Sequence, residues 1–71
     1  MIFKFVWPDR PDIGDLFLKA PYVDLTPNSV GNIYIVLDDG RGVALGAEGL
    51  RVYLLDDDGN TIDKPKVGGT V

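Results

Sequence analysis

Residues 32 to 62 alternate apolar and polar side chains, and two tight Asp-Gly turns interrupt the alternation. The first turn lies in Asp38-Asp39-Gly40-Arg41-Gly42 and the second in Asp56-Asp57-Asp58-Gly59-Asn60. Asp-Gly between alternating apolar runs is the strongest short-range signal for a β-hairpin. The sequence therefore predicts hairpins here, and we expect Asp39-Gly40 to form a type I′ turn, in which both central residues have positive φ.

Further short strands are predicted on both sides of this stretch. The predicted strands cover residues 2–7, 15–20, 32–38, 43–46, 50–56 and 61–67. Residues 32–38 are so apolar that we expect both faces of that strand to be at least half covered. Three glycines, at positions 42, 46 and 49, suggest a bulge or sharp bend near the fourth strand.

These elements predict an all-β fold: a small antiparallel β-barrel or two-sheet sandwich of about six short strands, mostly meander. Residues 1–71 are expected to form one domain, with a short flexible or docking tail at 65–71. A β-grasp fold is the rival. It needs a helix of about three turns after the first hairpin, and residues 21–32 contain two prolines and a glycine instead.

The chain contains 71 residues and neither cysteine nor histidine. Disulfides and thiolate or imidazole metal sites are excluded, as are nucleophile–base pairs of the common kinds. We therefore expect no catalytic, cofactor-binding or metal-binding residue, and no enzymatic activity. A domain this small buries only roughly 60% of its unfolded surface, so a partner chain is the remaining source of support.

The formal net charge is −4, from eleven acidic and seven basic residues. An acidic chain without a basic face argues against nucleic acid and against an anionic membrane surface as partners. The first seven residues lack the charged start and cleavage site of a signal peptide, and no apolar run is long enough to span a bilayer. A cytoplasmic or virion location is therefore expected, without secretion by a signal peptide.

The acidic turns raise the question of calcium, because Asp-x-Asp-Gly occurs inside EF-hand loops. The rest of that loop is missing: Leu54 and Pro65 stand at its first and twelfth positions. We favour a hairpin turn in which Asp side chains cap backbone amides. If both Asp-Gly turns lie at one end of the fold, five carboxylates form an acidic rim that favours solubility or attracts a basic partner.

The aromatic residues divide into two groups. Phe3, Phe5 and Trp7 share one face of the first strand, and their acidic surroundings favour core packing over a platform for nucleobases. Exposed tyrosines next to arginine and leucine are typical of the centre of a protein interface. The predicted contact surface consists of Tyr34, Val36, Arg51, Tyr53 and Leu55.

The function predicted from these features is a non-enzymatic structural or interaction module that docks on other protein chains, either a partner or further copies. Small all-β proteins without signal peptide or cysteine are common among virion accessory, capsid-decorating and tail-fitting proteins. Two alternatives remain. One is a small acidic regulator or inhibitor that binds a basic surface of a host enzyme, and the other is a de novo designed β-barrel without natural function.

Overall fold

The computed structural model describes residues 1–62 and 66–67, and the regular structure of this part of the chain is entirely β-strand. The predicted all-β class is confirmed. The described residues also include no helix of the length and apolarity that crossing a membrane requires. The strands are β1 (Ile2–Val6), β2 (Leu16–Lys19), β3 (Asn32–Val36), β4 (Gly42–Gly46), β5 (Arg51–Leu55) and β6 (Lys66–Val67).

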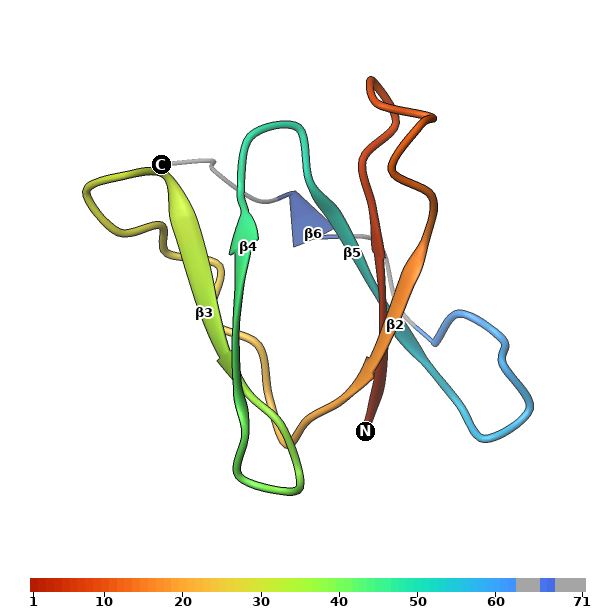
Figure 1. Cartoon of the computed structure of the whole chain (residues 1–71). Helices are drawn as coiled ribbons and strands as arrows, with labels where there is room; N and C mark the ends of the chain where they lie inside the picture. Colours follow the sequence, from red (N-terminus) through yellow and green to blue (C-terminus); the bar gives the residue numbers. More distant parts are fainter. Residues whose placement is uncertain (63–65, 68–71) are drawn as a thin grey trace.

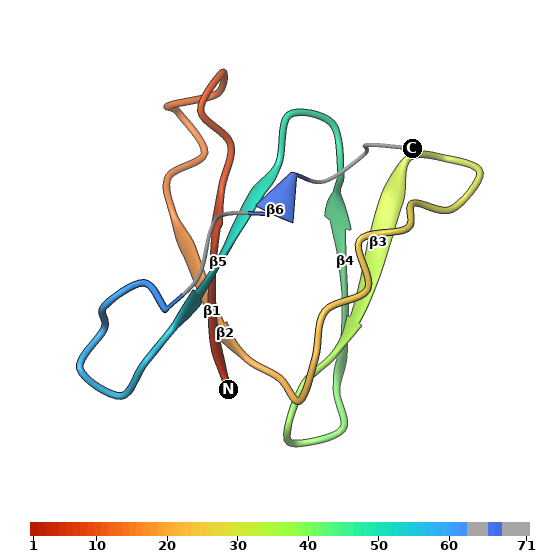
Figure 2. The same cartoon turned by 180° about the vertical axis from the view of Figure 1, so that it is seen from behind.

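The strands form two antiparallel sheets (Figures 1 and 2). One sheet has the order β2-β1-β5-β6, and the other is the β3-β4 hairpin. The predicted meander is only partly observed. The consecutive strands β1 and β2, β3 and β4, and β5 and β6 pair, but β2 does not pair with β3, nor β4 with β5. Instead, β1 pairs with β5 along its whole length, from Ile2 opposite Leu55 to Val6 opposite Arg51. No hydrogen-bonded ladder joins the two sheets within the described residues, so the sheets do not close into a barrel.

The core lies between the two sheets, because each strand turns alternate side chains inward. The predicted burial of the β1 aromatics is confirmed for Phe3 and Phe5, and Trp7 packs against them half-buried. Buried side chains come from both sheets and from the segments that connect them. They are Phe3, Phe5, Ala20, Ile33, Ile35, Ala47, Leu50, Val52 and Leu55.

Two single hydrogen bonds tie one sheet to the other at opposite ends. At the end where β4 finishes, the Trp7 indole Nε1 donates to the carbonyl oxygen of Gly46 over 2.9 Å. At the other end, the amide of Asp38 donates to the carbonyl oxygen of Lys19 over 3.0 Å. The sheets are therefore held by these contacts and by the shared core.

Three turns of the chain, at residues 28–32, 37–41 and 56–60, use the same hydrogen bonds. In each, the first amide donates to the fifth carbonyl, and the amide of the fourth residue donates to the first carbonyl. Only the fourth residue, a glycine, has positive φ, with values of 82°, 88° and 86°. The predicted type I′ turn at Asp39-Gly40 is therefore wrong.

The observed geometry at the Asp-Gly turns is a type I turn followed by a left-handed glycine. Asp39 keeps a negative φ and avoids left-handed strain. In this conformation its Oδ1 accepts a hydrogen bond from the amide of Arg41 over 3.0 Å. The side-chain bond favours the longer turn over the two-residue turn that the sequence suggested.

Candidate functional site

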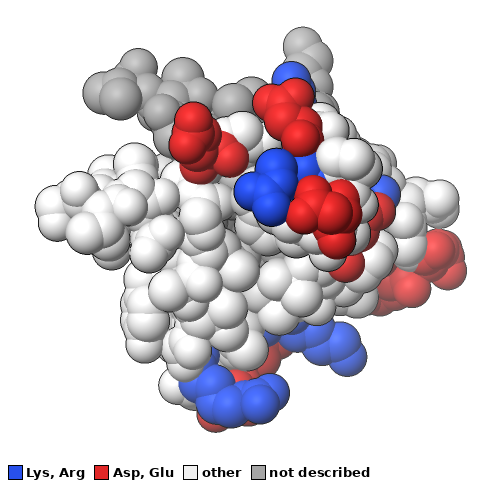
Figure 3. All heavy atoms as spheres, turned by 45° about the horizontal axis from the view of Figure 1, so that its top comes forward, with Lys and Arg blue, Asp and Glu red and all other residues white. Residues whose placement is uncertain are grey.

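Among the paired residues of β3 and β4, the outer side carries no charged residue. We call it the uncharged face, and it consists of Asn32, Tyr34 and Val36 of β3 with Gly42, Ala44 and Gly46 of β4. Tyr34 stands opposite Ala44, and Val36 stands opposite Gly42. In Figure 3 the far left of the molecule is white, whereas charged side chains lie over the upper middle and right-hand part and along the lower edge.

Tyr34 and Val36 project from this face into solvent. Their side chains are 64% and 46% exposed, while Ile33 and Ile35 on the opposite side of β3 are buried. The prediction that both faces of this strand are at least half covered is therefore wrong for the single chain. The alternation is that of a strand with one covered face, but the uncovered face carries an aromatic and a β-branched residue.

The Tyr34 ring does not stand upright on the sheet but lies across Gly42. A Cβ placed on Gly42 would overlap Tyr34 Oη and Cζ, whereas a Cβ on Gly46 would meet nothing within 4 Å. Pairing between β3 and β4 is continuous, so the bulge predicted from the glycines is wrong for β4. Because Gly42 has no side chain, the Tyr34 ring packs against its backbone, as aromatic residues do over glycines in strands.

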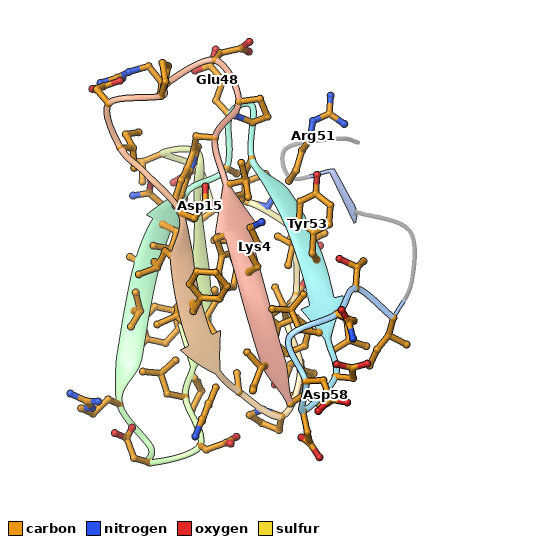
Figure 4. The ribbon with its side chains drawn as sticks, turned by 90° about the vertical axis from the view of Figure 1, so that its right-hand side faces the viewer. Lys4, Asp15, Glu48, Arg51, Tyr53 and Asp58 are labelled. Atoms are coloured by element: carbon orange, nitrogen blue, oxygen red, sulfur yellow. The ribbon has the colours of Figure 1, made fainter. Side chains whose placement is uncertain are left out.

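The outer side of the other sheet differs in character. We call it the charged face, after Lys4, which lies between Phe17 on β2 and Tyr53 on β5. Lys4 Nζ lies 5.7 Å from the centroid of the Tyr53 ring and 3.7 Å from Asp15 Oδ2. Figure 4 shows this face, with Lys4, Asp15, Tyr53 and Arg51 on it.

The five residues of the predicted contact surface do not lie together. Tyr34 and Val36 belong to the uncharged face, whereas Arg51 and Tyr53 belong to the charged face of the other sheet. Leu55 shares the outer side of β5 but is only 7% exposed. The structure therefore divides the predicted set between two surfaces that face away from the common core.

The two Asp-Gly turns do meet at one end of the molecule, as the acidic rim requires. Asp38, Asp56 and Asp57 line a hollow of about 490 Å³ whose apolar part includes Leu55 and Ile62. Asp56 Oδ1 accepts hydrogen bonds from the amides of residues 58 and 60, each over 2.9 Å. Its carboxylate is thus engaged in forming the turn, as the sequence interpretation proposed.

In the other Asp-Gly turn, an aspartate side chain likewise accepts a hydrogen bond from a backbone amide. Asp39 bonds both the amide and the guanidinium of Arg41, and the bond from the amide lowers the pKa of Asp39 below its usual value. No cluster of three or more carboxylates with the geometry of a metal site occurs within residues 1–62.

A second hollow, of about 550 Å³, surrounds Trp7 at the opposite end of the molecule. We call it the Trp7 hollow. Asp9 and Ile13 line it from the loop after β1, Val30 lines it from the loop before β3, and Glu48 lines it from the turn after β4. Sequence reasoning missed this site because it assigned Trp7 to the core, and because no local pattern brings three loops together.

Comparison with known proteins gives no relative: no family model, curated protein or solved structure matches the chain. The two faces and two hollows are therefore interpreted from their own geometry and chemistry.

Proposed function

We propose that the chain is a non-enzymatic interaction module that docks on other protein chains in a larger assembly, and that it docks through the uncharged face. The exposure of Tyr34 and Val36 on a face without charge carries this proposal. The centres of protein interfaces are enriched in tyrosine and depleted in charged residues. The small residues Ala44 and Gly46 leave part of the face low enough for another backbone to approach.

We further propose that the first occupant of this face is a second copy of the chain. With a net charge of −4, two copies repel each other at most orientations. A two-fold contact places each surface against itself, so a charged surface meets like charge. A two-fold contact through the uncharged face avoids that cost, because no like charges meet there. It also brings Tyr34 and Val36 of one copy close to the same residues of the other copy.

Such a contact also supplies what a chain of this size lacks. Burying an apolar side chain that was exposed stabilises a protein by about 1.5–3 kcal/mol. A small domain has only about 5–15 kcal/mol of total stability, so covering Tyr34 and Val36 is a substantial gain. We expect the two sheets to act as the layers of a small sandwich, with the docking partner covering the β3-β4 layer.

The test is the oligomeric state, measured by size-exclusion chromatography with light scattering over a range of concentrations. We expect association that increases with concentration and that Val36→Lys weakens. This substitution makes the net charge less negative, so general charge repulsion between copies decreases while the face itself becomes charged. A wild-type chain that stays monomeric at every concentration, or a variant that associates equally well, contradicts the proposal.

A further inference from the structure

The Trp7 hollow adjoins one end of the uncharged face, with which it shares Asn32 and Gly46, and is built around the only tryptophan of the chain. Trp7 is half-buried: it packs against the core and also lines the hollow. Its indole Nε1 donates to the Gly46 carbonyl oxygen over 2.9 Å, which fixes the orientation of the ring. The hollow therefore presents an aromatic surface that is already ordered before any ligand arrives.

Two acidic residues from different loops, Asp9 and Glu48, line the hollow together with this ring. Asp9 follows β1, and its Oδ2 lies 3.6 Å from the position of a Cβ on Gly49, the neighbour of Glu48. Neither Asp9 nor Glu48 forms an ion pair with another residue of the described chain.

Arg10, which also lines the hollow, does not neutralise the two carboxylates. Its guanidinium donates to Asp12 over 3.1 and 2.9 Å. This pairing raises the pKa of Arg10 and lowers the pKa of Asp12, so both groups stay charged and matched with each other. The negative charges of Asp9 and Glu48 remain available to a ligand.

We propose that the Trp7 hollow binds a lysine or arginine side chain presented by an extended segment of a basic partner protein. Tryptophan is the best aromatic partner for such a cation, and the two carboxylates supply counter-charge. Val30, 75% exposed, and Ile13, 48% exposed, offer apolar surface to the aliphatic stem of the guest side chain. This proposal does not rest on the docking proposed for the uncharged face, although the two surfaces share Asn32 and Gly46 at their border.

The other hollow, which Asp38, Asp56 and Asp57 line, is a weaker candidate for binding a basic side chain, although more carboxylates lie near it. Asp56 there is committed to backbone amides, and Lys19 lies among the lining residues. None of the described residues that line that hollow is aromatic. The comparison shows that counter-charge and an ordered aromatic surface coincide at the Trp7 hollow.

The experiment is a fluorescence titration, since Trp7 alone supplies the tryptophan emission. The probe is the peptide acetyl-(Gly-Arg)3-amide, and its neutral counterpart carries citrulline in place of arginine. We expect a saturable change in emission with the arginine peptide and none with the citrulline peptide. Binding should weaken as salt is added, because the attraction is electrostatic.

A matched pair of double variants separates a site from general attraction. Asp9→Asn with Glu48→Gln should weaken binding about tenfold or more, since it removes both counter-charges. Asp57→Asn with Asp58→Asn changes the net charge equally, and Figure 4 places Glu48 and Asp58 at opposite ends of the molecule. This control should bind within about threefold of the wild type, because charges beyond a Debye length are screened.

Several outcomes overturn the proposal. They are equal loss in the two double variants, greater loss in the control, equal binding of the citrulline peptide, or an unchanged emission at saturating peptide. Circular dichroism confirms that each variant is folded, and we expect it to be, because all four side chains are exposed. The titration is run at a concentration where the chain is monomeric, so failure of the docking proposal leaves its outcome unaffected.

Discussion

The outer faces of the two sheets are built from the same alternation but differ in how they treat solvent. On the charged face, Lys4 lies on β1, one of the two inner strands, and has Tyr53 on one side and Asp15 within 3.7 Å. On the uncharged face, the equivalent central position belongs to Tyr34, whose neighbours across the strand are Gly42 and Ala44. The charged face supplies polar partners for its own lysine, whereas the uncharged face exposes apolar surface to solvent.

This difference indicates which of the two faces is suited to remain exposed to water. A lysine placed among apolar side chains prevents a sheet face from docking, because burying its charge costs far more than a surface ion pair returns. Phe17 is 56% exposed, yet it stands opposite Lys4 and shares that protection. Nothing comparable protects Tyr34, so apolar area alone does not distinguish the faces, but the position of the charge does.

The largest expected effect comes from placing the same charge on each face in turn. Tyr34→Glu should weaken self-association by roughly 30-fold or more, the size of effect seen when a central tyrosine is lost from an interface. Tyr53→Glu should change it by less than about threefold, because the new carboxylate lies beside Lys4 on the face for which we propose no docking. Sedimentation velocity gives both dissociation constants, and a larger effect of Tyr53→Glu would reverse the comparison.

A second prediction tests whether Lys4 is what keeps the charged face in solution. Lys4→Met turns the row Phe17, residue 4 and Tyr53 into continuous apolar surface. We expect association to increase by roughly tenfold and larger oligomers to form, since the chain now has two apolar faces. Lys4→Gln serves as the control, because it removes the charge but keeps a polar group. If Lys4→Met sediments as the wild type does, the lysine is not the protecting element.

Much of this contrast follows from the sequence, but the part that matters most does not. The alternation in residues 32–38 correctly places Tyr34 and Val36 outward, and the Asp-Gly pairs correctly place two hairpins. The sequence also suggested that Tyr34 and Tyr53 belong to one surface. Their separation depends on β5 pairing with β1 rather than with β4, and local patterns contain no information on such a long-range choice.

The direction in which individual side chains point is the second feature that the sequence patterns do not predict. Leu55 alternates outward with Arg51 and Tyr53, but it is buried beside Ile2 at the end where the chain folds back. Tyr34 leans over Gly42 instead of standing on its direct neighbour Ala44. Neither contact is encoded by spacing, because each depends on the sheet that forms around it. The type I′ prediction failed for a related reason: in the observed longer turn Asp39 accepts a hydrogen bond from the Arg41 amide, which the Asp-Gly pair alone does not reveal.

A third prediction tests whether the Tyr34 ring packs on Gly42, by substituting two glycines of β4. Gly46→Ala should stabilise the protein by about 0.5–1 kcal/mol, because glycine in a strand costs that much relative to alanine and the site is open. Gly42→Ala should yield no gain and a loss of up to about 1 kcal/mol, since its methyl group displaces the Tyr34 ring. Urea unfolding measures both. Equal effects of the two substitutions would mean that the ring is not held on Gly42.

The smallest expected effect concerns the turn that ends the uncharged face. Hydrogen bonding to the Arg41 amide lowers the pKa of Asp39 below its usual value of 3.8. A carboxylate with a lowered folded-state pKa stabilises the fold above the unfolded pKa, and this contribution is lost as pH falls through the folded value. Between pH 5 and pH 3, roughly the range in which carboxylates protonate, the urea midpoint of the wild type should fall slightly more than that of Asp39→Asn. The asparagine keeps an oxygen that accepts the Arg41 amide but does not titrate, so the difference between the two slopes isolates this turn. If the slopes coincide, the turn contributes nothing that depends on its charge, and the hairpin is held by the glycine and the core alone.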